Sequence, residues 1–312
     1  MRILVVVPGT EEQYSRLRQA APGARFRFTL SPTEDEIGEA AVIVGNPPPA
    51  LLRKAASLRL LQLETAGANP YLGDVLPPEV PLCNAAGAYG PAIAEHLLAM
   101  LLSLYKKLPA YGENRRAALW RDEGTVRTVE GSTTLVVGLG DIGGQFARRL
   151  HALGGRVLGI KRTPGDCPEY LEGLYPPEAL DGLLPAADAV ALCLPSTPKT
   201  RGLFSRERLE RMKDGAVLLN VGRGDAVDTG ALDACLRSGK LGGAGLDVTD
   251  PEPLPPEHPL WGAPGLLITP HVSGGHHAAG TVDRIFQIAA DNLRALWEGR
   301  PLTHRVDRRE GY

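Results

Sequence analysis

The sequence predicts an α/β protein built on a doubly wound parallel sheet. Short apolar runs that suit buried parallel strands alternate with segments whose apolar residues recur at helical spacing. This alternation continues from about residue 133 to residue 270, as a doubly wound sheet requires. A length of 312 residues exceeds what one hydrophobic core usually supports, so we expect two domains.

Composition excludes several classes of partner. Hydrophobic residues make up 43% of the chain and charged residues 22%, which is typical of a globular protein. The net charge of −2 gives no general attraction to nucleic acid or an anionic membrane, and no apolar run approaches a membrane span. The N-terminus shows no signal pattern, and the four cysteines lack metal or redox spacing. We expect a cytoplasmic protein without a metal site, in which the cysteines are reduced.

Residues 1 to about 98 are expected to form a small α/β unit. Its predicted strands are residues 3–7, 25–29, 41–44, 58–63 and 80–83, and its predicted helices are residues 11–20 and 50–56. A long helix over residues 91–108 then leads into the second unit, and the last helix, residues 279–299, returns to the first. We expect His96 to be structural or surface-facing rather than catalytic, and Trp120 to be a packing residue rather than a ligand contact.

The most specific local motif lies in residues 134–163. An apolar strand is followed by a glycine turn, a helix and a second apolar strand. The turn contains Gly138, Gly140 and Gly143. In dinucleotide-binding folds these positions allow, in order, a tight turn, the approach of a pyrophosphate and close packing of helix on strand. The helix start at Asp141 and Ile142 would direct N–H groups at the phosphates. We therefore predict a Rossmann-type domain; an ordinary glycine-rich turn is the alternative.

Three charged or polar side chains follow predicted strands of this second unit. Arg223 stands between two glycines, Glu252 lies in a proline-rich loop, and His271 follows the last strand. A guanidinium binds a carboxylate bidentately, and a carboxylate beside a histidine orients the ring for acid–base work. Taken singly, each residue has a structural alternative: a solvated cap, a loop charge or a strand-end histidine. Their occurrence together at the ligand edge of one sheet favours a catalytic site.

A loop of small residues follows the predicted strand 58–63 in the first unit. Its sequence is ETAGAN, and the backbone amides at Gly67 and Ala68 are suited to hold a carboxylate. A plain turn is the alternative on local evidence.

These segments together resemble the D-isomer-specific 2-hydroxyacid dehydrogenases, in particular the glyoxylate and hydroxypyruvate reductase branch. The resemblance rests on VVGLGDIG, LPSTPKTRGLF, LLNVGRGDAVD, GLDVTDPEPLP and LLITPHVSGG, and it covers nearly the whole chain. It implies that Arg223, Glu252 and His271 are catalytic and that Asp247 binds the nicotinamide carboxamide. The cofactor would also be bordered by Pro195, Thr200, Val221 and Gly222.

The resemblance also implies a split architecture. A flavodoxin-like substrate domain, residues 1–98 with 281–312, would surround an inserted dinucleotide-binding domain, residues 99–280. A homodimer through the cofactor domain is expected for the same reason.

The position that follows the second strand of the nucleotide-binding unit bears on cofactor choice. Folds that prefer NAD place an acidic residue there to bind the ribose 2′-hydroxyl. This chain has Lys161, Arg162 and Thr163 instead, which would attract a 2′-phosphate. We therefore expect NADP(H) to be preferred over NAD(H); a solvated basic turn is the alternative.

The expected activity is the NADPH-dependent reduction of a small 2-keto acid, with glyoxylate or hydroxypyruvate as the leading substrate by resemblance. Arg223 and the amides at Gly67 and Ala68 would hold the carboxylate, and His271 would give a proton to the developing alkoxide. The alternative is a corepressor-like protein that senses a dinucleotide without turnover.

Overall fold

The chain folds into two compact units. The computed structural model describes residues 1–163, 165–275, 278–309 and 311. One unit comprises residues 1–89 and 275–312, and the other comprises residues 90–274. The predicted domain limits after residues 98 and 280 fall inside the long helices at these two divisions, and the roles of the domains stay a prediction.

The first unit is built on a parallel sheet with the strand order β2-β1-β3-β4-β5. Its strands are β1 (Arg2–Val5), β2 (Arg25–Phe28), β3 (Val42–Val44), β4 (Leu60–Gln62) and β5 (Leu82–Cys83). Its helices are α1 (Glu11–Ala20), α2 (Glu34–Glu39) and α9 (Ala279–Glu298). Helix α1 begins where the Thr10 hydroxyl accepts from the Gln13 N–H and the Gln13 side chain accepts from the Thr10 N–H.

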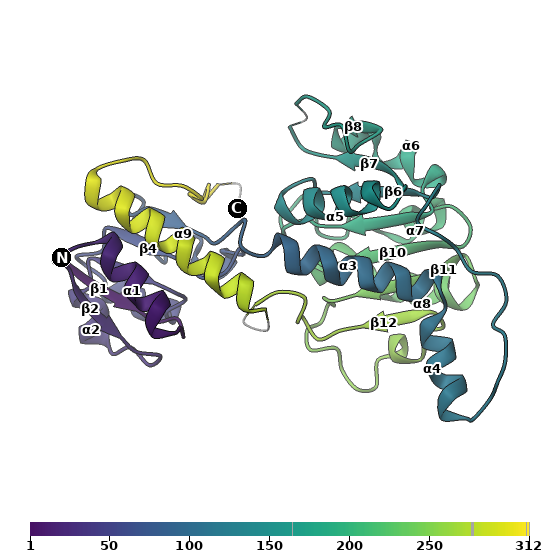
Figure 1. The fold of residues 1–312 in the computed structure, drawn as a ribbon, viewed down its shortest axis with the longest axis horizontal. Helices are drawn as coiled ribbons and strands as arrows, with labels where there is room; N and C mark the ends of the chain where they lie inside the picture. Colours follow the sequence, from purple (N-terminus) through teal and green to yellow (C-terminus); the bar gives the residue numbers. More distant parts are fainter. Residues whose placement is uncertain (164, 276–277, 310, 312) are drawn as a thin grey trace. The chain divides into compact units, whose positions relative to one another are not determined.

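Helix α9 completes the core of the first unit although it lies far from β1 in sequence. It packs beside α1, and both cover one face of the sheet (Figure 1). Phe286, Ala290 and Leu293 are fully buried against Ile3 and Leu17. The prediction that the last helix returns to the first unit is confirmed.

The second unit carries a larger parallel sheet with the order β12-β11-β10-β9-β6-β7-β8. Its strands are β6 (Thr133–Val137), β7 (Arg156–Ile160), β8 (Gly173–Tyr175), β9 (Ala189–Leu192), β10 (Ala216–Asn220), β11 (Leu241–Leu246) and β12 (Leu266–Ile268). Its helices are α3 (Gly90–Tyr105), α4 (Leu108–Arg116), α5 (Asp141–Ala152), α6 (Leu180–Leu183), α7 (Arg206–Arg211) and α8 (Thr229–Arg237). The strand order changes direction at β6, and the predicted doubly wound α/β fold is confirmed.

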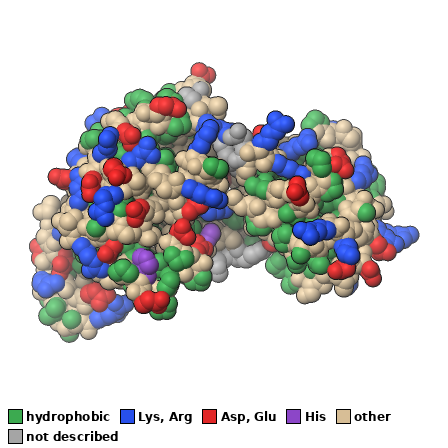
Figure 2. Space-filling model, turned by 180° about the vertical axis from the view of Figure 1, so that it is seen from behind, with side chains coloured by type: hydrophobic (Ala, Val, Ile, Leu, Met, Phe, Trp, Pro, Cys, Tyr) green, Lys and Arg blue, Asp and Glu red, His purple; other side chains and the backbone are tan. Residues whose placement is uncertain are grey.

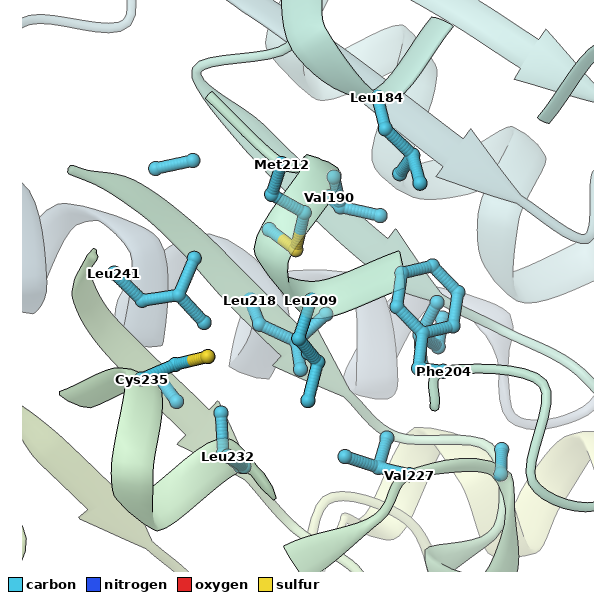
Figure 3. Packing of buried hydrophobic residues seen from close by; sticks show 14 of the residues in the cluster. Leu184, Val190, Phe204, Leu209, Met212, Leu218, Val227, Leu232, Cys235 and Leu241 are labelled. Carbon is cyan, nitrogen blue, oxygen red and sulfur yellow. The ribbon is translucent and has the colours of Figure 1, made fainter. Parts of the chain in front are cut away.

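Helices cover both faces of this larger sheet. On one face α3 and α5 lie side by side (Figure 1). On the other, side chains from α7 and α8 pack on the central strands in a dry cluster (Figure 3). Phe204, Leu209 and Leu218 in that cluster are fully buried. The strands are apolar on both faces because both faces are covered.

Three local predictions were wrong. The segment predicted as a helix over residues 50–56 is a short 3₁₀ helix, Pro49–Lys54, because its proline-rich start supplies few N–H donors. The helix predicted to reach residue 108 ends at Tyr105, and Lys107 turns left-handed before α4 begins. Trp120 was expected to pack inside the protein, but its side chain is fully exposed.

Charge is distributed without a single-sign surface on the face that Figure 2 shows, where basic and acidic side chains are intermixed. Within the described residues, no helix is long and apolar enough to cross a membrane. The cysteines, all of them described, form no disulfide in this structure.

The glycine turn between β6 and α5 provides a stability test. A Cβ on Gly143 would lie 2.2 Å from the Gly138 carbonyl oxygen, whereas a Cβ on Gly140 would meet no atom within 4 Å. We expect Gly143→Ala to lower the free energy of unfolding by roughly 1–3 kcal/mol, since backbone must move to relieve the overlap. Gly140→Ala, the matched control, should stay within about 1 kcal/mol of the original protein. Urea midpoints measure both, and equal midpoints would contradict the packing role of Gly143.

Candidate active site

The carboxyl ends of the central strands in the second unit bring the predicted site residues to one edge of the sheet. The loops in question follow β6, β9, β10, β11 and β12. Because these strands are parallel, their loops emerge at the same edge, where ligands of open α/β sheets bind.

The glycine turn after β6 has the shape that a pyrophosphate needs. Gly138 has φ +98°, and a Cβ there would lie 2.6 Å from the Cys193 carbonyl oxygen of the neighbouring loop. Gly140 precedes α5 with open space around its Cα and no capping side chain. The first N–H groups of α5 therefore have no intrahelical partner and can meet an anion. The backbone thus fits the dinucleotide predicted from the sequence.

Asp141 opens α5 and would repel a phosphate if its side chain faced one. Its Oδ2 instead accepts a hydrogen bond from the Gly90 N–H, 2.9 Å away at the start of α3. Asp141 therefore offers its backbone N–H to an anion while its carboxylate is held by another helix start.

The turn after β7 contains the predicted contacts for a 2′-phosphate. Lys161, Arg162 and Thr163 are all exposed. The Lys161 N–H donates to the Tyr175 carbonyl at 3.0 Å, which fixes the backbone where the turn begins. The turn offers cations and a hydroxyl where an NAD-specific site would offer a carboxylate.

The loop after β9 is closed by its own hydroxyl groups. Thr200 Oγ1 donates to the Pro195 carbonyl at 2.7 Å and accepts from the Thr197 N–H at 2.8 Å. Thr200 therefore shapes the loop in which Pro195 lies. Its role beside the cofactor stays a prediction.

Arg223 is held by a buried asparagine that the sequence reasoning missed. Asn220, 1% exposed at the end of β10, accepts from the Gly222 N–H at 3.0 Å and donates to the Arg223 carbonyl at 2.9 Å. A polar residue ending the otherwise apolar run AVLLN was the signal. Gly224 is also required, because a Cβ there would lie 2.0 Å from the Thr249 backbone.

The Arg223 guanidinium is available to a ligand. It is half-buried, and Nη1 donates to the Gly222 carbonyl at 2.6 Å. Among the residues that the structure describes, no carboxylate forms an ion pair with it. The remaining donors suit a carboxylate or a carbonyl oxygen.

His271 and Glu252 form the predicted pair. The His271 Nδ1 lies 2.7 Å from Glu252 Oε1, and each side chain is nearly half exposed. An ionised carboxylate only accepts, so Nδ1 carries the hydrogen and Nε2 remains for a substrate. His271 has φ +53°, a left-handed conformation that non-glycine residues seldom adopt.

The Asp247 side chain is buried and hydrogen-bonded within the chain. The sequence predicts that it binds the nicotinamide carboxamide, yet its side chain is 1% exposed and both oxygens have donors within the chain. Oδ1 accepts from the Thr269 hydroxyl at 2.6 Å and the Val272 N–H at 3.0 Å. Oδ2 accepts from the N–H and the hydroxyl of Ser273. Contact with a carboxamide stays a prediction.

In the loop of the first unit that contains Gly67 and Ala68, the carbonyl groups are held by hydrogen bonds. Four consecutive carbonyl oxygens, those of residues 64–67, accept hydrogen bonds from donors elsewhere in the unit. The donors are, in order, the Tyr89 hydroxyl, the Ala85 N–H, the Asn84 amide and the Thr65 hydroxyl.

The hydrogen bonds to these carbonyl groups also determine the direction of the N–H groups in the loop. In a trans peptide the N–H is opposite to the C=O of the same unit. The N–H groups of Gly67 and Ala68 therefore point away from the donors that bind the Ala66 and Gly67 carbonyls. Among the described residues, none accepts a hydrogen bond from either group. Ala68 itself is only 1% exposed, and binding of a carboxylate by these amides stays a prediction.

Asn46 supports the same loop from a separate segment. Its amide donates to the Thr65 hydroxyl at 3.1 Å, and its carbonyl oxygen accepts from the Glu64 N–H at 3.1 Å. The sequence reasoning missed Asn46 and Asn84 because both lie in segments without a recognisable motif. Within the described part of the chain, no group of three or more potential metal ligands comes together.

Comparisons with known proteins agree with this architecture. Residues 98–273 match the model of the D-isomer specific 2-hydroxyacid dehydrogenase, NAD binding domain. A family protein from Aeromonas salmonicida subsp. salmonicida A449 is 35% identical over 98% of this chain and 99% of that one, with a TM-score of 0.87. One from Xanthobacter autotrophicus Py2, solved with NADPH and MES, is 32% identical over 100% and 99%, with a TM-score of 0.86.

A third solved structure is the NADPH-dependent glyoxylate/hydroxypyruvate reductase from Sinorhizobium meliloti, in complex with NADP and sulfate. It is 28% identical over 100% of this chain and 99% of that chain, with a TM-score of 0.85. The family model and these matches over nearly the full length agree with each other. The chain belongs to the D-isomer-specific 2-hydroxyacid dehydrogenase family of NAD(P)-dependent oxidoreductases.

Proposed function

We propose that the protein reduces a small 2-keto acid to the D-2-hydroxy acid with NADPH. The observation that carries the proposal is the His271–Glu252 pair, 2.7 Å apart, at the sheet edge where Arg223 lies without an ion partner among the described residues. An acid, its orienting carboxylate and a free guanidinium are the groups that reduction of a keto acid requires.

Each residue has a defined task in this proposal. The bound dinucleotide supplies a hydride to the carbonyl carbon. Arg223 donates hydrogen bonds to the keto oxygen and the carboxylate, which lowers the energy of the negative charge that develops on that oxygen. His271 gives its Nε2 proton to the oxygen, and Glu252 stabilises the protonated ring before transfer.

The proposed substrates and cofactor rest on two observations. The S. meliloti relative is described as a glyoxylate/hydroxypyruvate reductase and was solved with NADP. In this chain, the turn after β7 exposes Lys161 and Arg162 with no acid at position 161. We therefore propose glyoxylate or hydroxypyruvate as the substrate and a preference for NADPH over NADH.

The first prediction concerns substrate and cofactor. In a panel of 2-keto acids assayed at 340 nm, glyoxylate and hydroxypyruvate should give the highest kcat/KM. The kcat/KM for NADPH should be higher than the kcat/KM for NADH. Lys161→Asp should reduce the NADPH preference about tenfold or more, because a carboxylate there repels a 2′-phosphate.

A matched control for that variant is Lys54→Asp, an exposed lysine in the first unit. It should leave the cofactor ratio unchanged. A preference for NADH in the original protein would refute the cofactor proposal. Binding of NADPH without turnover of any keto acid would instead favour the dinucleotide-sensing alternative.

A second prediction concerns the acid and the guanidinium. His271→Asn should lower kcat by roughly 10²–10⁴ with little change in the Kd for NADPH, because only proton transfer is lost. Arg223→Gln should raise the substrate KM and lower kcat together, since it removes contacts in both ground and transition states. His151→Asn, an exposed histidine on α5, is the control and should retain full activity. Unchanged turnover in His271→Asn would sink the assignment.

We also propose that residues 90–274 form the dinucleotide-binding domain and that the protein works in the cytoplasm. The unpaired state of its cysteines supports the second proposal, because reduced thiols suit that compartment.

A homodimer through the dinucleotide-binding domain is the last part of this proposal. Beyond α4, Leu119 is 50% exposed and Trp120 fully exposed, beside a hollow of about 670 Å³ that Tyr111 and Asn114 also line. Large apolar side chains that are exposed together mark protein interfaces.

Sedimentation equilibrium should therefore give twice the chain mass of 33.2 kDa. Trp120→Ser should shift the protein toward the monomer, whereas Trp297→Ser, on the first unit, should not. Monomer mass for the original protein would contradict the proposal.

A further inference from the structure

A chain of hydrogen bonds links α3 to the turn that bears His271. His96 Nε2 lies 3.0 Å from Thr269 Oγ1, and Thr269 Oγ1 lies 2.6 Å from Asp247 Oδ1. His96 and Asp247 also form a longer contact of 3.9 Å. The three residues come from α3, the end of β12 and the end of β11, so the chain joins separate elements of the second unit.

The direction of these hydrogen bonds follows from their chemistry. A threonine hydroxyl has one hydrogen, and an ionised carboxylate can only accept. Thr269 therefore donates to Asp247 and must accept from His96. This assigns a hydrogen to Nε2 of His96, so that the histidine acts as the terminal donor.

Asp247 needs these donors because it is a buried carboxylate. With 1% of its side chain exposed, it receives almost no solvation from water. A buried carboxylate is tolerated only where hydrogen-bond donors or cations replace water. Thr269 supplies one donor directly, and His96 polarises that hydroxyl from the other side.

Asp247 in turn fixes the backbone on which His271 stands. Its carbonyl accepts from the His271 N–H at 2.8 Å, and its carboxylate accepts from the N–H groups of Val272 and Ser273. Three consecutive amides are thus bound to one residue. Because φ +53° is unfavourable for a histidine, the turn keeps this conformation only while other contacts impose it.

We propose that His96 and Thr269 are positioning residues for His271. They hold the Asp247 carboxylate in the orientation that binds the turn, and the turn places the ring against Glu252. The inference rests on the proposed role of His271 as the acid. His96 was expected to be structural or surface-facing, and its hydrogen bond to Thr269 connects it to the turn that bears His271.

The experiment compares two pairs of variants. His96→Leu removes the donor, while His96→Gln keeps an N–H at a similar distance from the backbone. Thr269→Val removes the hydroxyl with little change in shape, while Thr269→Ser keeps it. We expect His96→Leu and Thr269→Val to lower kcat about tenfold or more, since small displacements of a reacting group have effects of this size. KM and the Kd for NADPH should change less than about threefold, and the Gln and Ser variants should recover most of the kcat.

Hydrogen exchange of the peptide that spans residues 266–275 gives a readout independent of turnover. The amides of His271, Val272 and Ser273 should exchange faster in the Leu and Val variants and at the original rate in the Gln and Ser variants. Unaltered exchange and unaltered kcat in both Leu and Val variants would overturn the inference. If His96→Leu does not fold, Thr269→Val decides. If the original protein reduces no keto acid, the proposed function fails while exchange still tests the positioning role.

Discussion

The buried carboxylate of Asp247 is the interaction on which the candidate site depends. It binds Thr269 on one side and the amides of Val272 and Ser273 on the other, so the end of β11 determines the course of the chain after β12. His271 adopts a left-handed backbone within this turn. A residue in a disfavoured backbone conformation needs surrounding contacts that impose it, and here the carbonyl and the buried carboxylate of Asp247 supply them.

The loop of residues 64–68 in the first unit is also held by hydrogen bonds, but its partners are uncharged groups. Its carbonyls accept hydrogen bonds from the segment of residues 84–89, including Asn84 and Tyr89, and from the loop's own Thr65 hydroxyl. Since a peptide plane is rigid, fixing each carbonyl also fixes the N–H that follows it. In each unit, the conformation of the candidate loop is thus determined by hydrogen bonds to buried or partly buried groups of the same unit.

The sequence predicted the parts of the fold that depend on local pattern. The apolar runs and the glycine turn predicted most strands of the second unit. The motifs predicted that Glu252 and His271 form a pair, and the structure has the two side chains in contact. It failed where the outcome depends on distant partners. The hydrogen-bonding roles of Asn84 and His96 could not be predicted from local pattern, because each binds a partner distant in sequence. Trp120 was interpreted as a packing residue from its residue type, but residue type does not determine burial at a single position.

Asp141 is an acidic residue at the start of α5, where a phosphate of the dinucleotide is expected to bind. A carboxylate at the first position of α5 competes with a phosphate for the positive end of the helix. The Gly90 N–H removes that conflict by holding the carboxylate at the start of α3, which is equally electropositive. A Cβ on Gly90 would lie 2.4 Å from the Asp141 oxygens, so a larger residue there would displace this carboxylate. The dinucleotide turn therefore depends on a glycine about fifty residues upstream, outside the motif by which the turn is recognised.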